Sequence, residues 1–144
     1  MEAMITLNCE KYSDNIIDVL KLFQDIGWDI YDTQGMVEFL PINDSGQYNW
    51  KREKISELKL YNIILDKIMH GEQIGINLFY NNGCEGITFI AESTKQIVLH
   101  LSINRKIYCG RYTDMAWYFE NIVYKLLNKN VRLLSYEVEE FEDW

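Results

Sequence analysis

The chain has 144 residues and a net charge of −8, from 22 acidic and 14 basic side chains. Apolar residues make up 48% of it and only one residue is proline, which excludes a disordered, collagen-like or low-complexity protein. Because this length suits one domain, we predict a single α+β domain over residues 1–144.

The first third of the chain combines short strand patterns with one helix. In chain order, the predicted elements are a strand at 4–8, a helix at 13–26 and strands at 28–32 and 36–40. Ser13 is the predicted N-cap of the helix. Between residues 41 and 53 the pattern stops, and Asn43-Asp44-Ser45-Gly46 indicates a turn inside a long loop. We expect binding residues in this loop, because irregular segments on a rigid scaffold often carry them.

A second helix is predicted over residues 56–71, with Ser56 as its N-cap, and a strand-rich segment follows it. Residues 74–103 alternate with a period of two and contain Asn82-Gly83, a strong signal for a hairpin turn. With these two residues as the turn, Leu78 faces Ile87 and the large apolar side chains fall on one side. A third strand continues the same apolar face, which helices can cover.

A third helix is predicted over residues 113–128, with Thr113 as its N-cap, and a last strand over 131–138. The element order is therefore β-α-β-β-α-β-β-β-α-β. We predict an α+β fold with a largely antiparallel sheet, whose central three-stranded meander at about 74–103 packs against three helices.

The N-terminus and the cysteines indicate a cytoplasmic protein. Residues 1–15 carry three acids and no basic region followed by an apolar run, which does not fit a secretory signal. No apolar stretch approaches the roughly 20 residues that cross a bilayer. The odd, widely spaced set of Cys9, Cys84 and Cys109 fits neither a disulfide framework nor a zinc site, so we interpret these residues as reduced thiols.

The acidic residues gather in two segments. Residues 22–50 contain five acids and no lysine or arginine, and residues 133–144 contain five more, again without a base. These segments carry −10, so the remaining residues carry a net charge of +2. Such a field disfavours nucleic acid and anionic membranes and favours a cationic protein partner. Acidic surfaces also keep cytoplasmic proteins soluble, and composition alone leaves both interpretations open.

Aromatic residues lie among these acids, as they do at interfaces with aromatic anchors and a polar rim. The alternative is that the aromatic side chains only pack the core and fix the loop. On the interaction hypothesis, the partner-binding residues are predicted to be Asp29, Asp32, Glu38, Asp44, Tyr48, Trp50, Glu137, Glu139, Glu140 and Glu142.

The sequence contains no catalytic or cofactor-binding motif, such as HExxH, a phosphate-binding loop or GxSxG. His70 is placed to interact with the C-terminal end of the second predicted helix. His100 is predicted to share a polar row with Thr88 and Asn77, either as a solvated sheet face or as part of a binding surface. We therefore predict a protein that is not an enzyme and has no cofactor and no metal.

A small α+β protein with localised acids, aromatic-rich loops and no catalytic motif resembles the immunity proteins of bacterial polymorphic toxin systems, including those of contact-dependent growth inhibition. The segment from Thr113 to Ile122, TDMAWYFENI, is similar in character to such proteins. The resemblance implies stoichiometric binding of a cognate toxin C-terminal domain, commonly a basic nuclease, at its active site or at a neighbouring surface. Carboxylates would then occupy the place of the nuclease's substrate phosphates.

Two other classes remain open at this stage. The same acids suit a different interaction module, such as an adaptor or a nucleic-acid mimic. A small enzyme or ligand binder is the third class, and a deep pocket containing His100 or converging carboxylates would favour it.

Overall fold

The computed structural model describes residues 1–142 and contains two sheets and a set of helices. Its strands are β1 (Glu2–Asn8), β2 (Trp28–Asp29), β3 (Val37–Phe39), β4 (Lys51–Glu53), β5 (Ile74–Tyr80), β6 (Gly86–Ser93), β7 (Gln96–Ile103), β8 (Ile107–Tyr108), β9 (Tyr112–Thr113) and β10 (Ser135–Phe141). Its helical segments are α1 (Ile16–Asp25), α2 (Glu57–Met69), α3 (Met115–Tyr118), the π-helix η1 (Phe119–Val123) and α4 (Tyr124–Asn128).

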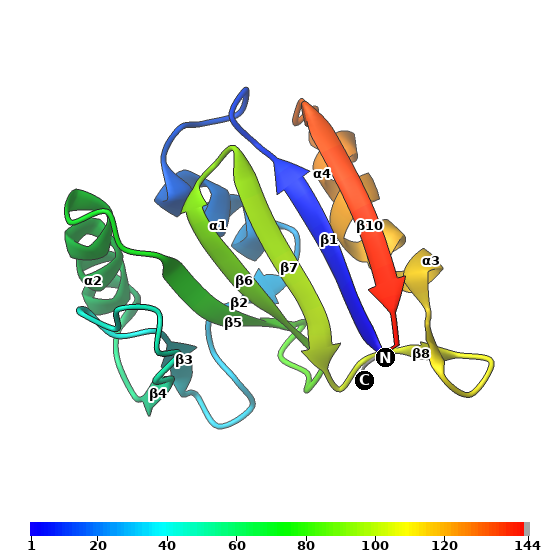
Figure 1. The fold of residues 1–144 in the computed structure, drawn as a ribbon, viewed down its shortest axis with the longest axis horizontal. Coiled ribbons are helices and arrows are strands. Elements are labelled where there is room, and N and C mark those ends of the chain that lie inside the picture. The colour runs from blue at the N-terminus through cyan, green and yellow to red at the C-terminus, as the bar shows by residue number, and fades with distance from the viewer. Residues whose placement is uncertain (143–144) are drawn as a thin grey trace.

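The main sheet has eight strands in the order β10-β1-β7-β6-β5-β3-β4, with β2 also paired to β5. Neighbouring strands are antiparallel throughout. Helices α1, α3 and α4 lie behind the sheet in Figure 1, while α2 lies beside it next to β3 and β4. The predicted fold class, α+β with a largely antiparallel sheet, is confirmed.

The period-two pattern predicted the register of the central meander correctly. Leu78 is the cross-strand neighbour of Ile87, as expected. The turn itself differs, because the residues with positive φ are Asn81 (49°) and Asn82 (59°), and Gly83 N donates to the carbonyl oxygen of the residue before them. Asparagine tolerates this left-handed conformation, so the turn forms one residue earlier without changing the register.

The helical face of the sheet forms the core. Every second residue of the four longest inner strands is buried there, which gives the set Ala3, Ile5, Leu7, Ile74, Ile76, Leu78, Ile87, Phe89, Ala91, Ile97, Leu99 and Leu101. Trp28 is completely buried against the ring of Trp117, and its indole N–H donates to the carbonyl oxygen of Asn121 at 2.9 Å. The segment from Thr113 to Ile122 therefore contributes to the core.

Two of the three predicted helix starts need correction. Ser56 caps α2 as predicted, with its hydroxyl accepting from Lys59 N at 3.1 Å. The N-cap of α1 is Asn15 rather than Ser13, and the N-cap of α3 is Asp114 rather than Thr113. In both cases a second capping residue lies one or two positions further along the chain and forms the cap instead.

Three strands lie outside the predicted set. Strand β4 lies inside the predicted long loop, and β8 and β9 form a separate two-stranded ribbon. The last strand covers Ser135–Phe141 instead of residues 131–138, because Val131 N still donates to Leu126 O at 3.1 Å and closes the end of α4. No helix among the described residues is long and apolar enough to cross a membrane.

All three cysteines are free, and only Cys9 is buried. Burial raises the pKa of the Cys9 thiol to about 12, so this side chain stays protonated and unreactive at neutral pH.

Leu40 is packed directly over Gly75 on the sheet face that carries no helices. A Cβ atom at position 75 would lie 2.4 Å from Leu40 Cδ1 and 2.6 Å from Leu40 Cγ, so the Leu40 side chain would have to move, and 3.1 Å from Ile90 Cδ1, a tight contact. The backbone of Gly75 is not in the left-handed region, so conformation does not explain a glycine here. The close approach of Leu40 explains it.

We expect Gly75→Ala to lower the free energy of unfolding by about 1–3 kcal/mol, the usual cost of overpacking. Urea unfolding of Gly75→Ala, Leu40→Ala and the double variant measures this cost. In the Leu40→Ala background the added methyl group has space, so its cost should largely disappear. Equal costs in both backgrounds would contradict this explanation.

Candidate protein-interaction site

The sheet face opposite α1, α3 and α4 carries a row of side chains that crosses five strands and is polar except for Met4. Register places Glu139, Met4, His100, Thr88 and Asn77 as successive cross-strand neighbours. Because directly opposed residues share a face, these side chains all lie on the side without helices. We call this side the open face. The predicted row of the histidine, the threonine and the asparagine is confirmed.

Hydrogen bonds continue this row to the far edge of the sheet. The hydroxyl of Thr88 donates to Asn77 Oδ1 at 2.7 Å, and Asn77 Nδ2 donates to Glu38 Oε2 at 2.6 Å. Arg52 then lies 3.6 Å from Glu38 and 2.9 Å from Asp32. The row therefore ends in a cluster of two carboxylates and one guanidinium.

The loop after β3 is fixed to α2 by a buried lysine. Lys67 is 1% exposed, and its ammonium group donates to the carbonyl oxygens of Leu40 at 3.0 Å and Pro41 at 2.8 Å. Burial lowers the pKa of Lys67, while the nearby carboxylates of Glu72 and Asp44 act in the opposite direction. These bonds position the first residues of the loop, because an unpaired buried ammonium is costly.

Asp44 fixes the second half of the loop from inside. It is only 7% exposed, and its carboxylate accepts from Tyr48 N at 2.9 Å and Asn49 N at 2.8 Å. This arrangement holds Tyr48 at a positive φ of 55°. Asp44, one of the predicted partner-binding residues, therefore directs its carboxylate into its own loop rather than toward solvent.

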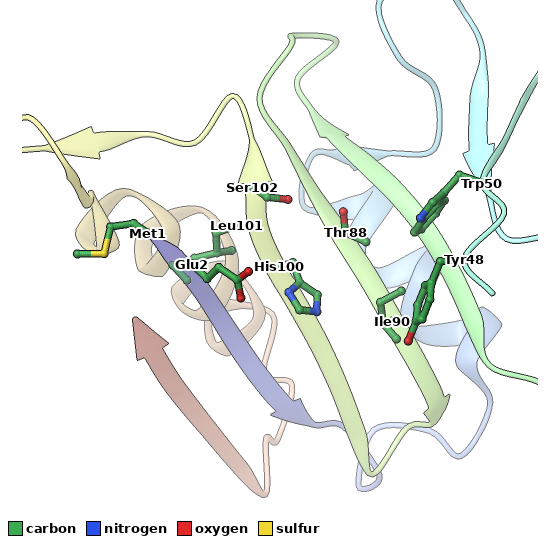
Figure 2. A pocket seen from close by; sticks show the side chains of 10 residues that line it. Met1, Glu2, Tyr48, Trp50, Thr88, Ile90, His100, Leu101 and Ser102 are labelled. Carbon is green, nitrogen blue, oxygen red and sulfur yellow. The ribbon is translucent and has the colours of Figure 1, made fainter. Parts of the chain in front are cut away.

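Tyr48 and Trp50 line a cavity of about 340 Å³ on the open face. Figure 2 shows these two rings on one side, Glu2 and His100 on the other, and Thr88 between them. Both aromatic residues remain exposed, at 52% and 37% of their surface. The predicted anchors therefore lie on the surface, in a loop whose conformation is fixed from below.

The acids of residues 22–50 are largely used by the structure itself. Asp29 Oδ1 accepts from Ile30 N at 2.7 Å and from Gln24 Nε2 at 3.3 Å. Asp32 accepts from two backbone N–H groups of its own turn and from the Arg52 guanidinium. Desolvation alone would raise the pKa of Asp32, but these hydrogen bonds outweigh it and the pKa is lowered.

Two of the C-terminal acids are held by other residues, and two lie on the open face of β10. Glu140 accepts from Thr113 N at 2.8 Å, and Glu142 pairs with the guanidinium of Arg111. Glu137 and Glu139 lie on the open face and form no ion pair with any residue in the described range 1–142. Asp143, the remaining acid of this segment, lies outside the described residues.

The two acidic segments lie at opposite edges of the sheet. Strand β10 is separated from β3 by β1, β7, β6 and β5, a distance of about 24 Å at the usual strand spacing. The first acidic segment contains no base, but in the folded chain Arg52 pairs with Asp32 and Glu38 and partly neutralises it. Sequence reasoning missed Glu2, which the strand alternation places on the open face, and Glu92, which lines hollows on this face together with Tyr48 and Ile90.

The arrangement is suited to cation recognition. Two aromatic rings and a carboxylate around one cavity can accommodate an ammonium or guanidinium group. Across residues 1–142, no group of three or more His, Cys, Asp or Glu side chains is placed to hold a metal ion. Comparisons with protein-family models, curated proteins and solved structures find no match.

We expect Asp44→Ala to release the loop. Removing the carboxylate leaves two backbone N–H groups without their acceptor, which should cost about 1–3 kcal/mol of stability. Amide exchange at Tyr48 and Asn49 should accelerate together with this loss. The exposed Asp25→Ala is the matched control and should leave both measurements unchanged. Unaltered exchange at the two loop amides would show that Asp44 does not hold them.

Proposed function

We propose that this protein is a cytoplasmic immunity protein that binds a cognate, basic toxin domain and neutralises it without catalysis. The observation that carries the proposal is the open face. Its residues on β10, β1, β7 and β6 include four acids and no lysine or arginine. These acids are Glu2, Glu92, Glu137 and Glu139.

The cavity adds a specific contact to this general attraction. A lysine or arginine side chain of the partner would enter between Tyr48 and Trp50 on one side and Glu2 on the other. Anchors of this kind contribute most when neighbouring contacts exclude water from them. Tyr48 and Trp50 fit this role because their loop is ordered before binding, which reduces the entropy lost on association.

The charge of the open face also supports an inhibitory action. A nuclease presents lysines and arginines to its substrate phosphates, and carboxylates on a rigid surface can pair with the same groups. Complementary fields raise association rates above the ordinary range of about 10⁵ to 10⁶ M⁻¹s⁻¹. A stable interface buries about 800 Å² on each partner, and the extended open face offers a surface for such an interface.

The cavity favours a second candidate function, the binding of a small cationic ligand. Its lining includes His100 and Glu2, two groups that could contact such a ligand directly. Its volume of about 340 Å³ lies at the lower end of the range for ligand pockets. A rise in melting temperature with choline or free arginine would support this function. An adaptor or nucleic-acid mimic would use the same acids but would protect no cell from a toxin.

Co-expression tests the proposal. The protein should restore the growth of cells that express the toxin domain encoded by the adjacent upstream reading frame. Growth no better with the protein than without it would end the proposal.

Variants of the two anchors test the site. The double variant Tyr48→Asn, Trp50→Ala should weaken toxin binding by at least about 30-fold, since an interface anchor contributes roughly 2 kcal/mol or more. Asparagine is chosen at position 48 because it tolerates a positive φ. The control Tyr12→Asn, Tyr108→Ala removes two exposed tyrosines elsewhere and should bind normally. Equal losses in both double variants would place the interface elsewhere.

A further inference from the structure

Strand β10 forms one edge of the main sheet along seven residues, and β1 is its only strand neighbour among residues 1–142. The opposite edge is β4, which has three residues. An edge strand of this length presents a row of backbone N–H and C=O groups that can pair with another chain. The side chains of β10 are exposed at every position except Glu140.

The two faces of β10 differ in chemistry. Glu137 and Glu139 lie on the open face. On the helical face, Tyr136 is 50% exposed and Val138 40% exposed, and the ring of Phe119 contacts Tyr136 at a centroid distance of 5.9 Å. The apolar side chains of Tyr136 and Val138 therefore reach the edge of the sheet and stay partly exposed there.

A second copy of this chain is a poor partner for this edge. Two β10 strands that pair antiparallel about Val138 would place Glu137 of each chain opposite Glu139 of the other. Like charges directly opposite each other destabilise a strand pair. The edge instead matches a strand with basic side chains on one face and apolar side chains on the other.

We propose that β10 accepts an extended, alternating basic and apolar strand of the toxin domain as an additional strand of the sheet. The basic side chains of that strand would face Glu137 and Glu139, and its apolar side chains would cover Tyr136 and Val138. Backbone hydrogen bonds supply affinity in this mode, and the alternating side chains supply specificity. The inference rests on the proposed function and specifies how the partner is bound.

The experiment measures toxin-domain affinity and amide exchange together. Glu137→Lys, Glu139→Lys should lower the affinity at least about tenfold, and Glu137→Gln, Glu139→Gln should give an intermediate loss. Asp25→Lys, Glu53→Lys makes the same change in net charge away from β10 and should stay within about threefold of the natural protein. Circular dichroism of each free variant checks that it is folded.

In the complex, amides of β10 that face outward should exchange more slowly, because each gains a carbonyl acceptor from the added strand. Binding with unchanged β10 exchange would overturn strand addition and leave the proposed function intact. Normal affinity of the lysine variant would overturn the pairing of Glu137 and Glu139 with basic side chains of an added strand. A dimer of the natural protein that involves β10 would make a second copy the occupant. Absence of any toxin binding would remove both proposals.

Discussion

The placement of the loop on the open face depends on two buried charges. Lys67 holds the start of the loop through two carbonyl oxygens, and Asp44 holds its second half through two backbone N–H groups. Each charge is taken from water, a cost that these hydrogen bonds offset together with the attraction of Lys67 to the carboxylates of Glu72 and Asp44. As a result, Tyr48 and Trp50 are presented from a fixed backbone at the edge of a cavity. Without these bonds the two rings would sample many orientations, and any partner would have to order them on binding.

The electrostatics of the molecule depend on which acids remain unpaired after folding. Asp32 and Glu38 meet Arg52, which comes from outside their acidic segment. Glu137 and Glu139 form no ion pair within residues 1–142, because the neighbouring strand β1 places the uncharged side chains of Thr6 and Met4 opposite them. The unpaired acids of the open face therefore include Glu137 and Glu139 at its β10 edge. The proposed partner must therefore present a basic surface, and that surface must meet the open face of the sheet.

The local hydrophobic pattern of the sequence predicted the fold class and the central strand register. Contacts between distant segments determined the helix starts and the geometry of the site. A period of two fixed the pairing of Leu78 with Ile87, because a shift of one residue would have turned the apolar side chains outward. The start of α1 was misplaced because Ser13 and Asn15 are both good caps, and only the path of the chain selects one. Local propensity and residue spacing could not predict three features: the pairing of Arg52 with Asp32, the burial of Asp44 and the cavity. All three arise from contacts between segments that are distant in the sequence.

The central claim is that the open face, rather than the helical face, meets a basic partner protein. The most direct measurement is the set of NMR chemical-shift changes in the isotope-labelled protein when the toxin domain is added. The account predicts changes at the Trp50 indole N–H and at the backbone amides of Thr88 and His100, with little change in α1. Changes confined to α1 and α4 would contradict it, because these helices cover the opposite face.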